Sequence, residues 1–232
     1  AAMGEMIDNI AHQWRQPLNI ISVTSTGVLF KNDLGKLEKD FVNDAMSNIN
    51  NSVQHLSQTI TDFRDFFNPN KKRGQFFIKQ TFEKTFKLLE SQFKTSGIII
   101  IKNIDDIDSI GFENELIQVF INILNNARDE LVKIKKEKKF IFIDVFKEND
   151  NLQIVIKDNA GGIPEKIKDK IMDSYFTTKE DFNGTGIGLY MCKIIISEHM
   201  NGYIKANNVE FEYEGNIYFG AEFRIVLPKI LE

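Results

Sequence analysis

The stretch "FFNPNKKRG", residues 66–74, divides the chain into two parts whose apolar residues follow different periods. Before it, apolar residues recur in steps of three and four through residues 39–68, which is the heptad spacing of a packed helix. After it, short apolar runs bounded by polar turns are typical of strands. Its proline, glycine and basic residues suit a linker. The sequence therefore predicts two domains, residues 1–70 and residues 71–232.

The first part is predicted to be a hairpin of two long helices. The polar stretch "KNDLGKLEKD", residues 31–40, contains a glycine and suits the connection between them. Each helix carries one apolar stripe, formed by Met3, Ile7, Ile10, Trp14, Pro17, Ile21 and Val28 in the first and by Val42, Met46, Ile49, Val53, Leu56, Ile60, Phe63 and Phe67 in the second. Two such helices leave apolar surface uncovered, and a second copy of the chain would cover it in a dimeric four-helix bundle. The alternative is a hairpin that packs against the C-terminal part of its own chain.

The second part is predicted to be an α+β domain. The expected strands are residues 75–80, 98–104, 139–147, 152–158, 202–207 and 217–227, and the expected helices are residues 81–95, 112–134 and 186–200. Strand runs interspersed with a few helices favour one mixed sheet with helices on one face, an α+β sandwich.

Composition and charge exclude several classes of protein. The net charge is −4 at pH 7, whereas a dedicated nucleic-acid binder is normally basic, so we expect no nucleic-acid partner. The sequence has no run of 18 or more apolar residues, so we expect no membrane span and no direct membrane contact. The single cysteine, Cys192, cannot form an internal disulfide. We expect it to be a small buried hydrophobe in a reducing, cytoplasmic compartment.

Two asparagines lie four residues apart in the expected helix 112–134, within "NILNNARDEL". Asn122 and Asn126 therefore share one helical face among apolar neighbours, where an amide is costly unless it binds something. An asparagine carbonyl is a hard oxygen ligand of the kind that Mg²⁺ accepts beside substrate phosphates. The alternative is that both asparagines are structural.

Two further clusters combine polar residues with glycine. In "IVIKDNAGGIP", an apolar strand ends at Asp158, and Gly162 follows, so a carboxylate could accept the amino hydrogen of a base whose ring lies against the glycines. Taken alone, this stretch also fits a plain β-turn. In "NGTGIGLY", Gly184, Gly186 and Gly188 alternate just before a helix, so that backbone N–H groups could converge on phosphate.

In this order, and together with "AHQWRQPLN" at residues 11–19, these clusters resemble the sensor histidine kinases of two-component systems. The resemblance covers nearly the whole chain. It implies a dimerisation and histidine-phosphotransfer hairpin, followed by a catalytic ATP-binding domain of the GHKL (Bergerat) type. It places the phosphoacceptor at His12, the magnesium ligand at Asn126 and the acceptor of the adenine amino group at Asp158. The other residues that we assign to the ATP site are Gly162, Phe176, Lys179, Gly184, Thr185, Gly186 and Gly188.

The resemblance implies an ATP-dependent protein histidine kinase that phosphorylates its own His12. Such a kinase acts with Mg²⁺ as a homodimer and passes the phosphoryl group to an aspartate of a response regulator receiver domain. Superfamily relatives that hydrolyse ATP have a glutamate where this chain has Asn122, so transfer to histidine is favoured over hydrolysis. The alternative is a nucleotide-binding, non-catalytic dimeric scaffold that docks a response regulator.

The residues around His12 depart from the family pattern. An acid commonly follows the phosphoacceptor, where this chain has Gln13, and Thr or Asn often stands at the place of Gln16. A glycine usually stands at Ala160. Asp8 lies one turn before His12 on the same helical face, so we expect Asp8 to orient His12 and take its proton. The alternative is that Asp8 is a solvated carboxylate favoured by the helix dipole.

Overall fold

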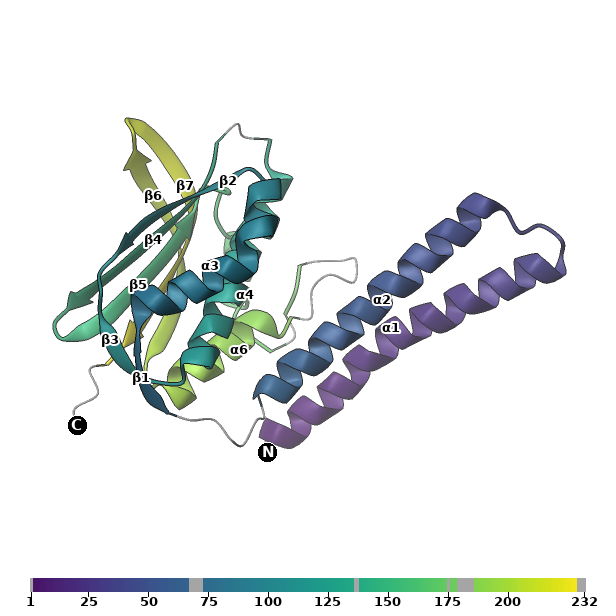
Figure 1. Cartoon of the computed structure of the whole chain (residues 1–232), viewed down its shortest axis with the longest axis horizontal. Coiled ribbons are helices and arrows are strands. Elements are labelled where there is room, and N and C mark those ends of the chain that lie inside the picture. Colours follow the sequence, from purple (N-terminus) through teal and green to yellow (C-terminus); the bar gives the residue numbers. More distant parts are fainter. Residues whose placement is uncertain (1, 67–72, 136–137, 175, 179–185, 229–232) are drawn as a thin grey trace. The chain divides into compact units, whose positions relative to one another are not determined.

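The structure is a computed structural model of the chain, which forms two compact units (Figure 1). It describes residues 2–66, 73–135, 138–174, 176–178 and 186–228, with the backbone alone for residues 2–14, 16, 55 and 58–66. The domain boundary expected at residue 70 lies outside the described residues and stays a prediction. Among the described residues, no helix combines the length and apolar character that crossing a membrane requires.

The first unit is a hairpin of α1 (Ala2–Asp33) and α2 (Lys39–Phe66), which lie side by side. After α1 ends, Gly35 adopts a left-handed φ of 65°, and its N–H donates to the carbonyl of Asn32 at 2.9 Å. A left-handed glycine just beyond the last turn is a common helix end, because glycine has no Cβ to clash there. The predicted helical hairpin, with its glycine-containing connection, is therefore confirmed.

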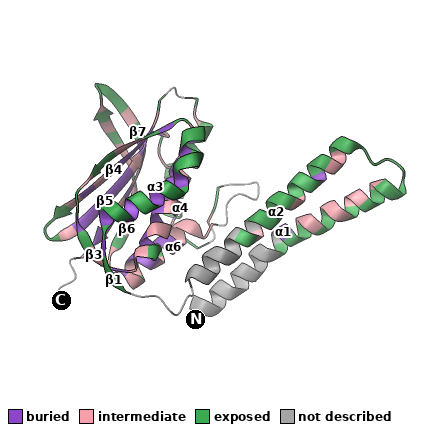
Figure 2. Ribbon diagram, viewed as in Figure 1, coloured by how far each residue is buried: buried purple, intermediate pink, exposed green. Residues whose placement is uncertain are grey.

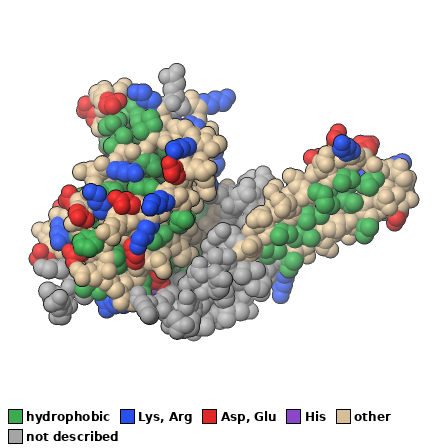
Figure 3. Space-filling model, in the orientation of Figure 1, with side chains coloured by type: hydrophobic (Ala, Val, Ile, Leu, Met, Phe, Trp, Pro, Cys, Tyr) green, Lys and Arg blue, Asp and Glu red, His purple; other side chains and the backbone are tan. Residues whose placement is uncertain are grey.

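Small residues lie where the two helices of the hairpin approach each other. Ala45 and Ser52 are only 3% and 6% exposed, although neither belongs to the predicted apolar stripe. Two members of that stripe, Met46 and Val53, remain 49% and 46% exposed. Apolar side chains are visible along the outside of the hairpin in Figure 3. The hairpin alone thus leaves part of its apolar stripe uncovered, as the heptad pattern predicts.

The second unit is an α+β sandwich, and this part of the predicted fold class is also confirmed. Its five-stranded sheet has the order β2-β4-β5-β7-β6, with β2 parallel to β4 and all other neighbours antiparallel. A separate antiparallel pair joins β1 to β3. The strands are β1 (Gly74–Phe77), β2 (Ile98–Ile104), β3 (Asp108–Gly111), β4 (Lys139–Glu148), β5 (Asn151–Asp158), β6 (Tyr203–Tyr213) and β7 (Asn216–Leu227). The helices are α3 (Ile78–Thr95), α4 (Glu113–Lys133), α5 (Glu165–Lys168), α6 (Gly188–Ile194) and the π-helical turn η1 (Ile195–His199).

The core of this unit lies between the sheet and the helices α3, α4 and α6, which pack on one face (Figures 1 and 2). The rings of Phe82 on α3 and Phe120 on α4 stack with centroids 3.9 Å apart, and both are fully buried. Every second residue of the central strands meets these helices, since side chains alternate between the faces of a sheet. Strand residues that are at most 1% exposed include Ile141, Ile143, Val145, Ile154, Ile156 and Ile225.

Some predicted boundaries were wrong. The strand expected at residues 75–80 ends at Phe77, because Ile78 begins α3 and is buried in the core. The helix expected at residues 186–200 begins at Gly188 and turns π-helical from Ile195. The strand expected at residues 202–207 continues to Tyr213, and the short elements β3 and α5 were not predicted.

Candidate nucleotide-binding site

The structure brings the asparagine cluster of α4 to the start of α6. Asn122 Nδ2 donates to the carbonyl oxygen of Gly188 at 3.3 Å. A Cβ built on Gly188 would lie 3.6 Å from the amide of Asn122, so the two helices are in close contact at this point. Asn126 follows one turn later on the same face of α4 and is half-buried. Asn122 and Gly188, which are 66 residues apart in sequence, are thus in direct contact.

Asp158 ends β5 as predicted, and backbone donors hold its carboxylate in place. The side chain is 4% exposed, and Oδ1 accepts the N–H of Ala160 at 2.8 Å and the N–H of Ala221 at 3.3 Å. Hydrogen bonds from N–H groups to a carboxylate are strong because the acceptor is charged. These two bonds fix the direction of the carboxylate relative to the sheet. An oxygen held in this way can present a constant geometry to a ligand.

The turn after Asp158 needs glycine because of its backbone conformation and because neighbouring side chains lie close to it. Gly161 and Gly162 have φ values of 104° and 80°, in the region that favours glycine. A Cβ on Gly162 would lie 2.7 Å from Asn208 Oδ1 and 2.9 Å from the ring of Phe219. The N–H of Gly161 donates to the carbonyl of Phe219 at 3.1 Å. The turn therefore rests on β6 and β7.

Two residues next to Asp158 support it, and neither was predicted from the sequence. Asn159 is fully buried; its Oδ1 accepts the N–H of Phe140 at 2.8 Å, and its Nδ2 donates to the carbonyl of Lys138 at 3.0 Å. A Cβ on Gly220 would overlap the backbone carbonyl oxygen of Asp158. A glycine inside an apolar strand often marks such a close approach, so Gly220 could have been found from the sequence.

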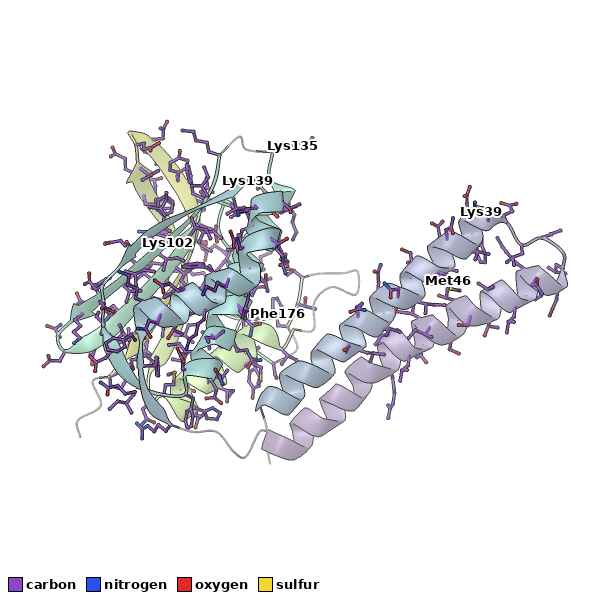
Figure 4. The ribbon with its side chains drawn as sticks, viewed as in Figure 1. Lys39, Met46, Lys102, Lys135, Lys139 and Phe176 are labelled. Atoms are coloured by element: carbon purple, nitrogen blue, oxygen red, sulfur yellow. The ribbon has the colours of Figure 1, made fainter. Side chains whose placement is uncertain are left out.

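Several expected site residues lie outside the described part of the chain. They are Lys179, Gly184 and Thr185 and the side chains of Asp8, His12, Gln13 and Gln16. Phe176, labelled in Figure 4, is half-buried, and its N–H donates to the carbonyl of Asp173 at 3.4 Å. Gly186 has a left-handed φ of 64°, two residues before α6 begins.

Comparison with known proteins identifies the family. The sequence family described as "Histidine kinase-, DNA gyrase B-, and HSP90-like ATPase" matches residues 111–230, more than half of the chain. The chain belongs to this family. The matched residues contain the asparagine cluster, the turn after Asp158, and the residues of β6 and β7 that contact this turn, Asn208 and Phe219. We therefore call the second unit the ATPase domain.

The resemblance to sensor histidine kinases is confirmed over nearly the whole chain. AtoS, a signal transduction histidine-protein kinase of Escherichia coli, is 27% identical over 98% of this chain and 35% of its own length. Sporulation kinase E of Bacillus subtilis is 31% identical over 97% of this chain and 28% of its own length. The chain thus spans about a third of the length of these curated relatives.

Solved structures show the same fold. The catalytic domain of the histidine kinase ThkA superposes on 68% of this chain and 98% of its own, with a TM-score of 0.56 and 26% identity. The crystal structure of ThkA in complex with the response regulator protein TrrA covers 98% of this chain and 62% of that chain, with a TM-score of 0.68 and 22% identity. The hairpin followed by an ATPase domain is therefore a known arrangement of these two folds.

Two titratable groups of the ATPase domain are structural. Cys192 on α6 is fully buried, as predicted, and burial raises the pKa of its thiol to about 12, against a smaller opposite effect of a hydrogen bond with Asn122. His199 ends η1, and its Nδ1 lies 2.9 and 3.0 Å from the carboxylate oxygens of Glu115 on α4. Glu115 is almost completely buried, so this pair ties the first turn of α4 to the end of η1.

Proposed function

We propose that the chain is the kinase core of an ATP-dependent protein histidine kinase, which phosphorylates its own His12. The observation that carries the proposal is the contact between Asn122 and Gly188, which joins the asparagine cluster to the glycine cluster in an ATPase of this family. The relatives named above, a signal transduction histidine-protein kinase and a sporulation kinase, support it.

The ATPase domain offers complementary groups for ATP and Mg²⁺. Asp158 would accept the adenine amino group through its fixed carboxylate, and Gly186 and Gly188 would provide backbone N–H groups for phosphate. Among the described residues, no group of three or more His, Cys, Asp and Glu side chains could hold a metal. Mg²⁺ would bind to the amide oxygen of Asn126 and to nucleotide phosphates, a donor set that suits it.

Asn122 favours phosphoryl transfer to histidine over hydrolysis. A hydrolytic site needs a base that takes a proton from water, and a neutral amide is no such base. Here the Nδ2 of Asn122 donates to the carbonyl of Gly188, which gives this residue a positioning role between α4 and α6. Water is therefore not activated at this position.

His12 would receive the phosphoryl group on an imidazole nitrogen. The nitrogen lone pair forms a bond to the γ-phosphorus while the bond from this phosphorus to the ADP oxygen breaks. The proton on the other ring nitrogen must then leave or be held by an acceptor. Gln13 is neutral, so we assign this role to Asp8, one turn earlier on α1.

Two partners complete the proposal. A second copy of the chain would cover the exposed apolar stripe of the hairpin, which gives a homodimer. A response regulator receiver domain would then take the phosphoryl group from His12 onto an aspartate, in keeping with the complex that ThkA forms with TrrA. The alternative, a non-catalytic scaffold that binds nucleotide and docks a response regulator, predicts no phosphohistidine.

Labelling of the full chain with γ-³²P-labelled ATP tests the proposal. We expect label that is lost in acid and retained in alkali, as for phosphate on an imidazole nitrogen. His12→Gln should abolish labelling and keep ATP binding, whereas Asn126→Ala and Asp158→Ala should weaken ATP binding itself. Asp8→Asn should slow labelling at least about tenfold, since general-base assistance is typically worth a hundredfold or more. Label that persists in His12→Gln would rule out His12 as the acceptor, and ATP binding without labelling of the wild type would favour the scaffold.

A further inference from the structure

Asn208 of β6 pairs with the backbone of the turn that follows Asp158. Its Oδ1 accepts the N–H of Ile163 at 2.6 Å, and its Nδ2 donates to the carbonyl of the same residue at 2.8 Å. Nδ2 also donates to Glu165 Oε1 at 3.1 Å. One side-chain amide thus satisfies both backbone groups of Ile163, as the backbone of a neighbouring strand would.

The two glycines give the middle of the turn little stiffness of their own. Gly161 and Gly162 are adjacent, both have positive φ, and glycine loses more conformational freedom on ordering than any other residue. Pro164 follows Ile163; its ring fixes its own φ, but it has no N–H with which to anchor the chain. The bonds of Asn208 to Ile163 therefore hold the far end of the glycine pair, whose near end is held by the bond from the N–H of Gly161 to the carbonyl of Phe219.

The same side chain also supports the glycine that faces the expected base. A Cβ on Gly162 would come within 3 Å of both Asn208 Oδ1 and the Phe219 ring, so both residues lie directly beneath the glycine. Removal of the Asn208 amide would free the peptide between Gly162 and Ile163 and leave two backbone groups without these partners. Rigid support of this kind lowers the entropy that a ligand must remove on binding.

We infer that Asn208 is a positioning residue for the adenine end of the nucleotide site. It acts through Ile163 and Gly162 and does not touch the nucleotide. The inference rests on the proposed function, because it presumes that ATP binds against this turn. Loss of two neutral hydrogen bonds and of the rigid turn should weaken ATP binding about tenfold or more. Phosphoryl transfer at saturating ATP should change much less than the affinity, because the phosphate groups would bind at the start of α6, away from Asn208.

Two substitutions of Asn208 separate hydrogen bonding from volume. Asn208→Ala removes the amide. Asn208→Asp keeps the size and one acceptor, but it places carboxylate oxygen near the Ile163 carbonyl and the Glu165 carboxylate, where Nδ2 now donates. Adding Glu165→Gln to Asn208→Asp removes one of these repulsions and should restore part of the affinity. The matched control is Asn207→Ala, at the exposed neighbouring position of β6, whose side chain lies on the opposite face of the strand.

The experiment is calorimetric titration of each variant of the 232-residue chain with Mg·ATP and, separately, with Mg·tripolyphosphate. Both Asn208 variants should lose affinity for ATP and keep that for tripolyphosphate, whereas Asn207→Ala should match the wild type for both. Hydrogen exchange at the Ile163 amide, measured by NMR without ligand, should be faster in Asn208→Ala than in the wild type and should be unchanged in Asn207→Ala.

The outcomes separate the inference from the proposed function. A wild type that binds no ATP would contradict the proposed function, whatever the exchange of Ile163. Wild-type ATP affinity in Asn208→Ala, or an equal loss of affinity for ATP and tripolyphosphate, would overturn the positioning role. If Asn208→Ala unfolds, the comparison of Asn208→Asp with and without Glu165→Gln decides, and an absence of recovery in the double variant would count against the inference.

Discussion

At the scale of single residues, burial decides the chemistry of Cys192. Its thiol is fully buried, and its pKa is raised from 9.0 to about 12. A thiol reacts as the thiolate. Because the pKa of the thiol is 9.0 in the unfolded chain and about 12 in the folded protein, at pH 8 the folded protein should contain about a thousandfold less thiolate than the unfolded chain. We expect an Ellman reagent to label the native protein very slowly and the chain in guanidinium chloride at once.

The raised pKa of Cys192 also makes the stability of the folded state depend on pH. Well below pH 9 both states carry a mostly neutral thiol, and the contribution of the group is nearly constant. As the pH rises from 9 towards 12, the unfolded state ionises first and the folded state loses stability. Denaturant titration of wild type and Cys192→Ala should show this extra alkaline loss in the wild type alone. Rapid labelling of the native protein at pH 8 would contradict a buried, neutral thiol.

The sequence was sufficient to find site residues that are polar in an otherwise apolar strand or helix. Asp158 at the end of an apolar strand and Asn122 on a helical face both stood out, and the structure places them at the end of β5 and against α6. Asn208 gave no such signal, because its partner Ile163 lies 45 residues away and the pairing depends on how β6 meets the turn. Asn159 was missed for the same reason, since its bonds reach back to the start of β4.

At the scale of elements, local periodicity predicted the helices and strands, and tertiary contacts set their ends. β2 matches its predicted range, residues 98–104, because the apolar run Ile98–Ile101 identifies the strand and Gly97 and Asp105 bound it on either side. β6 and β7 are joined by Glu214 and Gly215, which both have positive φ, as a two-residue hairpin turn requires. Glutamate is unusual there, so the turn was not recognised and the strand was predicted to end too early.

The hairpin of α1 and α2 yields a prediction about assembly. Ile49 belongs to the apolar stripe of α2 and is half-buried within one hairpin, so a second copy would bury it further. Ile49→Asp would then bury an unpaired carboxylate, which is costly. Light scattering of the full chain at micromolar concentration should show a dimer for the wild type and a monomer for this variant.

The control for that measurement is Asn50→Asp, which adds the same charge at the exposed neighbouring position of α2. It should remain dimeric. A wild type that is monomeric under these conditions would contradict the four-helix bundle, and a dimeric Ile49→Asp would show that the chains associate through another surface.

At the scale of the whole molecule, the two units differ in what holds them together. The ATPase domain has a buried, mainly apolar core between its sheet and three helices, whereas the hairpin buries small residues such as Ala45 and keeps apolar residues such as Val53 exposed. The first unit can therefore be stable alone only to a limited extent, and association would add to its stability. Nucleotide binding would instead stabilise the ATPase domain, which contains the proposed nucleotide site.

Differential scanning calorimetry of the full chain should accordingly resolve two transitions. The hairpin transition should rise with protein concentration, because association stabilises it by mass action. Mg·ATP at a hundred times its Kd should stabilise the ATPase domain by about 2.7 kcal/mol, which corresponds to roughly 5–10 °C for a domain of this size. Asn126→Ala should remove that shift and leave the hairpin transition in place. A single transition that Mg·ATP shifts as a whole would contradict the prediction that the two domains unfold separately. A shift of the hairpin transition alone would contradict nucleotide binding by the ATPase domain.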